Sequence, residues 1–176
     1  MKPTIRLRKL ENKDIQYMQE WMIDSEIMKW FRLPPNSMEE NNIKEFIKKA
    51  KTGIGEGGDI HYAIINPEDE YLGTISLKNI DINVRKAEYA IVLRRKAMGK
   101  GIGEEATRLI LKKAFMDEGL NRIYLNVLSE NLNAIKMYKK CGFIFEGEFR
   151  NHILIKGKLK SLKWYAVLKE DYIREN

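Results

Sequence analysis

The chain is poor in cysteine and histidine and has no long hydrophobic run. Its one cysteine, Cys141, cannot form an internal disulfide, so we expect a reducing cytoplasm. The two histidines, His61 and His152, are too few and too isolated for a metal site. No apolar stretch approaches the length of a membrane span, and residues 1–8 lack the apolar core of a signal peptide. These absences favour a soluble cytoplasmic protein without metal or membrane partners.

Acidic residues are outnumbered by basic ones, 25 to 32, which gives a formal net charge of +7. A basic surface attracts anions such as nucleic acid, acidic lipid or a phosphorylated cofactor. No block of five like charges occurs, so a polybasic tail is not the source of this charge. We find no internal repeat, low-complexity tract or linker, and the length of 176 residues predicts one domain over residues 1–176.

Hydrophobic periodicity and turn residues predict the order β-α-α-β-β-β-α-β-α-β-β, which implies a mixed sheet in the α+β (mixed α/β) class. Strands are predicted over residues 4–10, 61–66, 72–80, 87–93, 122–127, 143–150 and 159–168. Helices are predicted over 12–24, from Ser37 onward, over 103–118 and over 131–140. Ser37–Glu40 fits a capping box, and Gly119 and Gly142 fit helix ends.

A glycine-rich loop, Met98–Gly103, leads into a helical run that follows it directly. Three glycines at alternate positions let the backbone curl tightly, because glycine reaches positive φ without steric cost. Backbone N–H groups of the loop and of the first helical turn, with the positive end of the helix dipole, form a socket for phosphate. Lys100 adds positive charge. We therefore expect a ligand that carries a diphosphate.

Three phosphate ligands compete for this loop. The nucleotide P-loop needs Gly-x-x-x-x-Gly-Lys-(Ser/Thr), which the chain lacks. Gly101–Ala106 matches the Gly-x-Gly-x-x-Ala of dinucleotide-binding folds. However, Arg94–Met98 separates it from the preceding strand, and the strand over 122–127 does not end in the acidic residue that holds a ribose. The third ligand is coenzyme A, which a second block of sequence favours.

The segments 88–93, 98–103 and 131–143 together resemble the GNAT superfamily of N-acetyltransferases. Gly101 and Gly103 fit the family loop (Gln/Arg)-x-x-Gly-x-(Gly/Ala), and residues 131–143 fit Asn-x-x-Ala-x-x-x-Tyr-x-x-x-Gly-Phe. The resemblance extends over nearly the whole chain and is strongest to ribosomal-protein, polyamine and sugar-nucleotide amine acetyltransferases. It implies a central, mostly antiparallel sheet of about seven strands, with helices on both faces and a V-shaped cofactor cleft.

The resemblance implies acetyl-CoA as co-substrate and direct acetyl transfer to a primary amine. The backbone of the strand residues would pair with the pantetheine amides, the loop would hold the pyrophosphate, and Asn131 would bond the pantetheine arm. Asn131 is equally suited to be a helix N-cap, and the two roles are compatible. The implied cofactor residues are Ile91, Val92, Leu93, Met98, Gly99, Lys100, Gly101, Ile102, Gly103, Glu104, Asn131 and Tyr138.

Met98 departs from the family, which has Gln or Arg at this place. A thioether cannot donate a hydrogen bond to phosphate, so we expect weaker pyrophosphate contact through backbone amides. Neighbouring cations would supply the missing charge. The candidates are Arg94, Arg95, Lys96 and Lys139.

Amine acetylation needs a base for the ammonium proton and an acid for the departing thiolate. The resemblance places Tyr138 beside the thioester sulfur as the acid; the alternative is a core tyrosine packed against Phe143. Glu88 is the candidate base, acting through water near the mouth of the cleft; the alternative is a solvated carboxylate at a strand end. Cys141 is interpreted as a packing residue rather than a nucleophile.

The acceptor pocket is expected from the N-terminal helices and the C-terminal hairpin. The candidate lining residues are Trp30, Phe31, Arg32, Leu33, Glu39, Glu40, Phe149, Arg150 and His152. Glu39, Glu40 and Asp59 would suit a polyamine, whereas Arg32, Arg150 and Lys156 suit an anionic acceptor such as a nucleotide-linked amino sugar. A small-molecule amine is favoured, with a protein N-terminus and an antibiotic amine as alternatives.

A non-enzymatic basic module that binds nucleic acid is the competing class of protein. It would explain the charge of +7 but not the glycine loop followed by Asn131 and Tyr138. The chain also lacks a strand with aromatic residues interleaved between basic ones, so nucleic acid is an unlikely partner. The family analogy suggests a possible homodimer.

Overall fold

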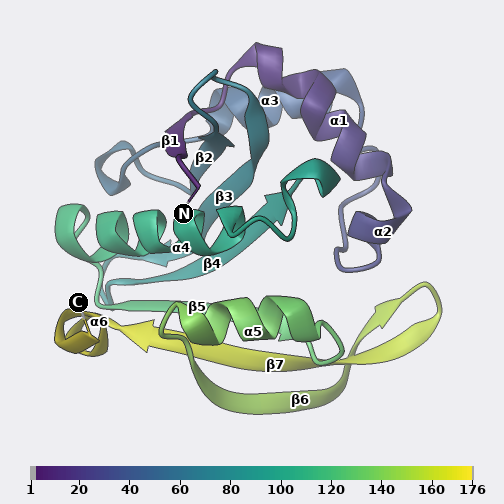
Figure 1. Cartoon of the computed structure of the whole chain (residues 1–176). Helices are drawn as coiled ribbons and strands as arrows, with labels where there is room; N and C mark the ends of the chain where they lie inside the picture. Colours follow the sequence, from purple (N-terminus) through teal and green to yellow (C-terminus); the bar gives the residue numbers. More distant parts are fainter. Residues whose placement is uncertain (1–2, 176) are drawn as a thin grey trace.

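The computed structural model describes residues 3–175 and arranges seven strands in one sheet with the order β1-β2-β3-β4-β5-β7-β6 (Figure 1). The strands are β1 (Arg6–Lys9), β2 (Ile60–Ile65), β3 (Tyr71–Asp81), β4 (Lys86–Leu93), β5 (Arg122–Leu128), β6 (Ile144–Ile155) and β7 (Lys158–Leu168). Each neighbouring pair is antiparallel except β4 and β5, which are parallel. The predicted mixed, mostly antiparallel sheet is confirmed.

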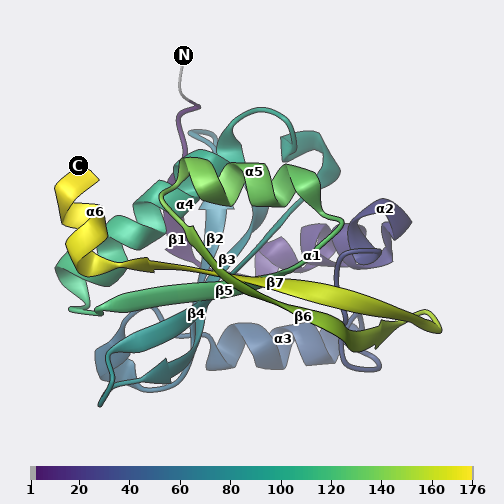
Figure 2. The same cartoon turned by 90° about the horizontal axis from the view of Figure 1, so that it is seen from below.

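Helices cover both faces of the sheet. They are α1 (Ile15–Ile23), α2 (Ser25–Met28), α3 (Glu40–Lys49), α4 (Ile102–Lys112), α5 (Leu132–Lys140) and α6 (Lys169–Glu175), and α4 continues as a π-helical turn over Lys113–Asp117. Seen from below, α4 and α5 lie on one side of the sheet and α1 and α3 on the other (Figure 2). The first strand is shorter than expected, and α2 and α6 were not predicted.

The capping box predicted at Ser37 is wrong. Helix α3 begins at Glu40 with Glu39 as its N-cap, and no side chain caps it. The hydroxyl of Ser37 instead donates to the carbonyl oxygen of Pro34 at 2.6 Å, within the preceding turn. Because this turn uses the hydroxyl of Ser37, the hydroxyl is not available to cap a helix N-terminus, and the predicted capping box does not form.

Alternating strand residues divide the core into two layers. On β2, Tyr62 and Ile64 pack toward α4 and α5, whereas Ala63 and Ile65 pack toward α1 and α3. The same alternation on β4 sends Tyr89 to the α4 side. Because successive side chains of a strand point to opposite faces, β4 contacts both layers and can carry a different function on each.

Strands β4 and β5 pair only at their beginning. The parallel register joins Lys86–Glu88 to Arg122–Tyr124 and then ends, while β3 pairs with β4 through Leu93 and β7 pairs with β5 through Leu128. The rest of β4 therefore has a partner on one side only. This divergence is the V-shaped opening that the family resemblance implied.

Candidate active site

A cavity of about 600 Å³ opens where β4 and β5 diverge; we call it the cofactor cleft. Strand β4, the glycine loop, the start of α4 and helix α5 form its walls. Ten of the expected residues line it, namely Ile91, Val92, Leu93, Met98, Gly99, Gly101, Gly103, Glu104, Asn131 and Tyr138. Among these ten, residues up to 47 positions apart in the sequence, Ile91 and Tyr138, thus meet around one space.

The glycine loop uses positive φ at two of its three glycines. Gly99 has φ 71° and Gly101, the N-cap of α4, has φ 75°. Gly103 is helical, and a Cβ there would lie 3.4 Å from Leu93 Cδ1, so this position serves close packing instead. The free N–H groups of the first turn of α4 follow directly, which is the arrangement that binds phosphate.

Two expected loop residues lie outside the cleft. The Ile102 side chain is 7% exposed and packs into the core, because the first turn of α4 presents it to the sheet. Lys100 is exposed and is not among the lining residues, so the positive charge expected from it does not reach the cleft wall.

None of the three cations at 94–96 that are expected to compensate for Met98 is among the residues that line the cofactor cleft. Buried Arg94 donates to Glu20 at 2.6 Å and to Glu70 at 3.1 Å, and Lys96 pairs with the same Glu70. Arg95 pairs with Asp24 in the same way. These ion pairs join helix α1 and the loop after α1 to the β3–β4 end of the sheet.

Helix α5 supplies the cations that sequence reasoning missed. Lys136 and Lys140 line the cofactor cleft, whereas the expected Lys139 does not. Residues four apart lie on the same helix face, as Lys136 and Lys140 do. This four-residue spacing is the sequence signal that could have selected these two lysines instead of Lys139. Lys140 lies 3.9 Å from a carboxylate oxygen of Glu104, which also lines the cleft.

The location of Asn131 is compatible with both of the roles suggested for it. Its side-chain oxygen accepts from the backbone N–H of Ala134 at 3.3 Å, which makes it the N-cap of α5. The residue also lines the cofactor cleft. Capping uses the oxygen and leaves the amide nitrogen for a ligand, so the two roles require different atoms.

Tyr138 packs into the core and also reaches the cleft. Its ring lies edge-on to Tyr89 and Phe143, with centroid distances of 5.7 and 5.8 Å, as the core interpretation predicted. Within residues 3–175 its hydroxyl has no hydrogen-bond partner, and the residue lines the cleft at 8% exposure. Burial raises the pKa of Tyr138 above its usual value, so the phenol stays protonated. A protonated, unpartnered hydroxyl is suited to donate a proton.

Glu88 lies at the closed end of the V rather than near its mouth. It is the last β4 residue paired with β5, and it lines neither large cavity described here. Its carboxylate accepts from the side-chain amides of Asn79 at 2.7 Å and Asn126 at 3.3 Å, and Lys78 Nζ is 3.8 Å away. These contacts hold a charged carboxylate on the α3 side of the sheet.

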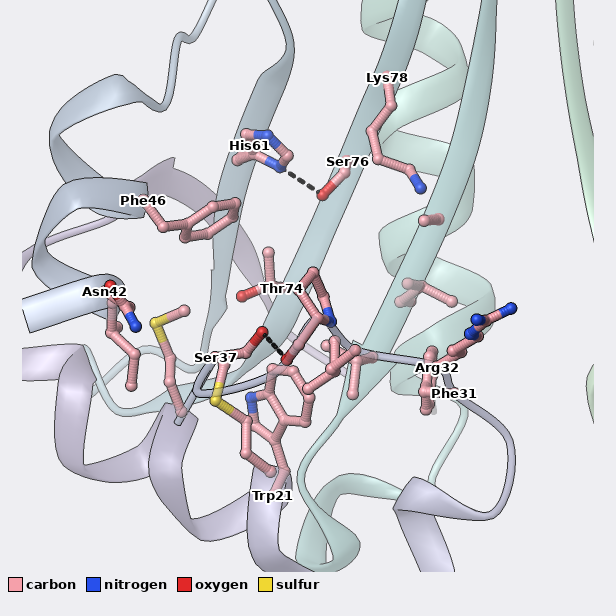
Figure 3. Close-up of a pocket in the computed structure, with 18 residues that line it drawn as sticks. Trp21, Phe31, Arg32, Ser37, Asn42, Phe46, His61, Thr74, Ser76 and Lys78 are labelled. Carbon is pink, nitrogen blue, oxygen red and sulfur yellow. Dashed lines mark hydrogen bonds between the residues drawn. The ribbon is translucent and has the colours of Figure 1, made fainter. Parts of the chain in front are cut away.

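A second cavity, of about 440 Å³, lies on the α1–α3 side of β4; we call it the acceptor cavity (Figure 3). Trp21, Phe31 and Phe46 contribute aromatic walls. Thr74, Ser76 and Lys78 follow along one face of β3. Phe31, Ile91 and Val92 line both this cavity and the cofactor cleft, so the two spaces meet at β4.

Only part of the expected acceptor set lies at this cavity. Phe31, Arg32 and Leu33 line it, and Trp30 lines the cofactor cleft. The expected residues that line none of the cavities described here are Glu39, Glu40, Asp59, Phe149, Arg150 and His152. Phe149 instead packs on His152 and Trp164 within the C-terminal hairpin, with centroid distances of 5.1 and 5.3 Å. Lys156, at the tip of that hairpin, lines an adjoining outer cavity of about 430 Å³.

His61 is a polar residue of the acceptor cavity that sequence reasoning did not select. Its Nδ1 lies 2.7 Å from Ser76 Oγ, and its ring packs against Phe46 at a centroid distance of 4.6 Å (Figure 3). Burial lowers its pKa from 6.5 to about 4, with an opposing contribution from Asp59. The imidazole is therefore neutral near pH 7.

We expect protonation of His61 to weaken the fold in acid. The unfolded chain takes up this proton near pH 6.5, so the stability is full above that pH and falls as the pH drops toward 4. The whole loss is about 2–3 kcal/mol. Urea unfolding between pH 4 and 7.5 should give a shallower pH slope for His61→Gln than for the parent. His152→Gln, at an exposed position, should keep the parent slope, and equal slopes for all three proteins would refute the expectation.

The described residues contain no group of three or more His, Cys, Asp or Glu side chains placed to hold a metal ion. No helix in that part of the chain is long and apolar enough to cross a bilayer.

A cavity beside a divergent β4–β5 pair is the arrangement that the resemblance to acetyltransferases implied, and the comparison with protein families agrees. The model of the acetyltransferase (GNAT) domain matches residues 4–144, so the chain belongs to the GNAT acetyltransferase family. It is an acyltransferase that uses acetyl-CoA. The resemblance read from the glycine loop and the Asn131–Phe143 segment is confirmed.

Individual relatives are similar over nearly the whole chain. The spermidine N(1)-acetyltransferase of Vibrio cholerae is 27% identical over 177 residues, covering 100% of this chain and 99% of that protein. An uncharacterized N-acetyltransferase of Bacillus licheniformis is 30% identical, covering 96% and 94%. The crystal structure of the Vibrio cholerae spermidine N-acetyltransferase with CoA and spermine superposes with a TM-score of 0.85 at 25% identity, covering 96% of this chain and 98% of that one.

Proposed function

We propose that this chain acetylates the primary amine of a small molecule by direct attack on acetyl-CoA in a ternary complex. One observation carries the proposal: the cofactor cleft and the acceptor cavity lie on opposite faces of β4 and share Phe31, Ile91 and Val92. A donor in one and an amine in the other would meet at this strand. Relatives named for spermidine, one of them solved with CoA and spermine, support a small amine as acceptor.

In the proposed reaction the amine nitrogen attacks the thioester carbonyl carbon, forming the C–N bond as the C–S bond breaks. The backbone of Ile91–Leu93, which lacks a β5 partner, would pair with the pantetheine arm as an added strand does. The glycine loop and first turn of α4 would hold the pyrophosphate, with Lys136 and Lys140 nearby. Tyr138 would protonate the departing sulfur.

Glu88 would take the ammonium proton through water at the vertex of the V. Its position between Lys78, Asn79 and Asn126 keeps a carboxylate on the acceptor side of β4. In Glu88→Gln, kcat should fall about 100-fold, and the acidic limb of the pH–rate profile should disappear because the group that must be ionised is gone. A profile that keeps the same limb would reject this role.

The proposal is tested by incubating the protein with acetyl-CoA and a panel of amines while following thiol release. The panel should contain spermidine, spermine, amino sugars and a short peptide with a free N-terminus. Acetylated product from at least one small amine, seen by mass spectrometry, is the expected result. Acetylation of the peptide alone would favour the protein-amine alternative.

One acetyltransferase domain over residues 1–176, a cytoplasmic location and a homodimer are further parts of the proposal. The single sheet that runs from β1 to β7 supports one domain. The lone buried cysteine suits a reducing compartment. Exposed Ile144, Phe145 and Phe149 on the edge strand β6 suit contact with a second copy, which light scattering would measure.

A further inference from the structure

The acceptor cavity and the outer cavity have no acidic wall. Among residues 3–175, the side chains that line these two spaces include no aspartate and no glutamate. The nearest candidates, Asp59 and Glu88, lie outside both linings, and Glu88 is already hydrogen-bonded to two asparagines. A polyamine would have to place unreacting ammonium groups against apolar walls without a counter-charge, which is costly.

Apart from Arg32 and from Lys78, which lies 3.8 Å from Glu88, the polar side chains that line the acceptor cavity are neutral hydrogen-bonding groups. Thr74, Ser76 and His61 lie together on β3 and β2, with the pKa of His61 lowered by burial. The aromatic rings of Trp21 and Phe46 line the same cavity, with Phe46 packed directly against His61 (Figure 3). Hydroxyl groups beside flat apolar rings suit a hydroxylated ring, which has both polar edges and apolar faces.

Arg32 brings a positive charge to both of these cavities. It lines both the acceptor cavity and the outer cavity, and it is exposed. In the described part of the chain it has no ion pair or hydrogen bond, unlike Arg94 and Arg95. Lys156 lines the same outer cavity and is likewise without an ion pair among residues 3–175. The guanidinium of Arg32 and the ammonium group of Lys156 line the same outer cavity, and together they are suited to bind a phosphate.

We propose that the acceptor is an amino sugar that carries a phosphate group, with its ring in the acceptor cavity and its phosphate at Arg32 and Lys156. This inference rests on the proposed function and specifies its substrate class. The amine would point from the ring toward β4, where the two cavities meet. A sugar monophosphate and a nucleotide-linked sugar share this phosphate chemistry, and the test below distinguishes them.

The test compares kcat/KM for matched amines with and without phosphate. The probes are glucosamine, glucosamine 1-phosphate, glucosamine 6-phosphate, a thymidine-diphosphate-linked 4-amino-4,6-dideoxyglucose, and spermidine. At least one phosphate-bearing sugar should exceed glucosamine and spermidine by tenfold or more. A monophosphate preference identifies a sugar phosphate as the source, and a preference for the linked sugar identifies a nucleotide.

Arg32→Ala should reduce the advantage of the phosphate-bearing sugar over its phosphate-free counterpart by about tenfold, through KM rather than kcat. Arg6→Ala is the matched control, because Arg6 is an exposed arginine on β1 that lines neither cavity. Equal use of phosphorylated and free sugars, or spermidine as the best substrate with no effect of Arg32→Ala, would overturn the inference.

A binding measurement distinguishes failure of this inference from failure of the proposed function. If no amine releases thiol, the proposed function fails, and calorimetry with the CoA-bound protein then decides the inference alone. Binding of a phosphate-bearing amino sugar that weakens tenfold in Arg32→Ala would still support the assignment. Absence of binding by all phosphate-bearing probes would refute it.

Discussion

Replacing Tyr138 with phenylalanine should lower kcat by about 100-fold or more while leaving the dissociation constant of CoA unchanged. General acid catalysis by a positioned group contributes about 10²–10⁴ to the rate. The ring contacts with Tyr89 and Phe143 remain in the variant, and the lost hydroxyl has no partner within residues 3–175. The fold should therefore be kept. Steady-state thiol release and calorimetry with CoA measure the two quantities.

Tyr89→Phe provides the matched control for this experiment. Tyr89 belongs to the same aromatic cluster, but its hydroxyl is hydrogen-bonded to Thr107 Oγ1 at 2.7 Å. Losing this bond should cost about 1 kcal/mol of unfolding free energy and leave kcat nearly unchanged. A Tyr138→Phe enzyme within twofold of the parent kcat would remove the acid role from this residue.

Gly73→Ala should both destabilise the protein and weaken CoA binding. A Cβ at Gly73 would lie 2.2 Å from the carbonyl oxygen of Val92 and 3.0 Å from Leu93 Cα, so the β4 backbone must move. We expect about 1–3 kcal/mol less unfolding free energy, as for other overpacked sites. Because Val92 and Leu93 line the cofactor cleft, the dissociation constant of CoA should rise at least tenfold.

The control for Gly73 is Gly55→Ala, in a loop where an added Cβ would meet nothing within 4 Å and no left-handed φ is required. This variant should match the parent in both measurements, which are urea unfolding and CoA calorimetry. Parent-like values for Gly73→Ala as well would mean that the β3–β4 contact does not shape the cleft.

Much of the fold was readable because its signals are local. Glycine at a helix end is one such signal, since Gly119 and Gly142 end their helical segments with φ of 68° and 87°. The predicted capping box at Ser37 was wrong because two local structures compete for the same hydroxyl, and the preceding turn uses it. Helix α6 was missed because Tyr172 packs on Phe115, far away in the sequence.

The sequence alone determined the glycine loop with its positive φ angles, the α5 segment with Asn131 and Tyr138, and the family. These are properties of neighbouring residues: backbone φ, helical spacing and side-chain type. Only the tertiary structure decided that Arg94, Arg95 and Lys96 are ion-paired, that Glu88 lies at the vertex, and that Gly73 must be small. It also decided that no carboxylate among residues 3–175 lines the acceptor cavity. Charge pairing and steric contact join residues that are far apart along the chain, so no local pattern encodes them.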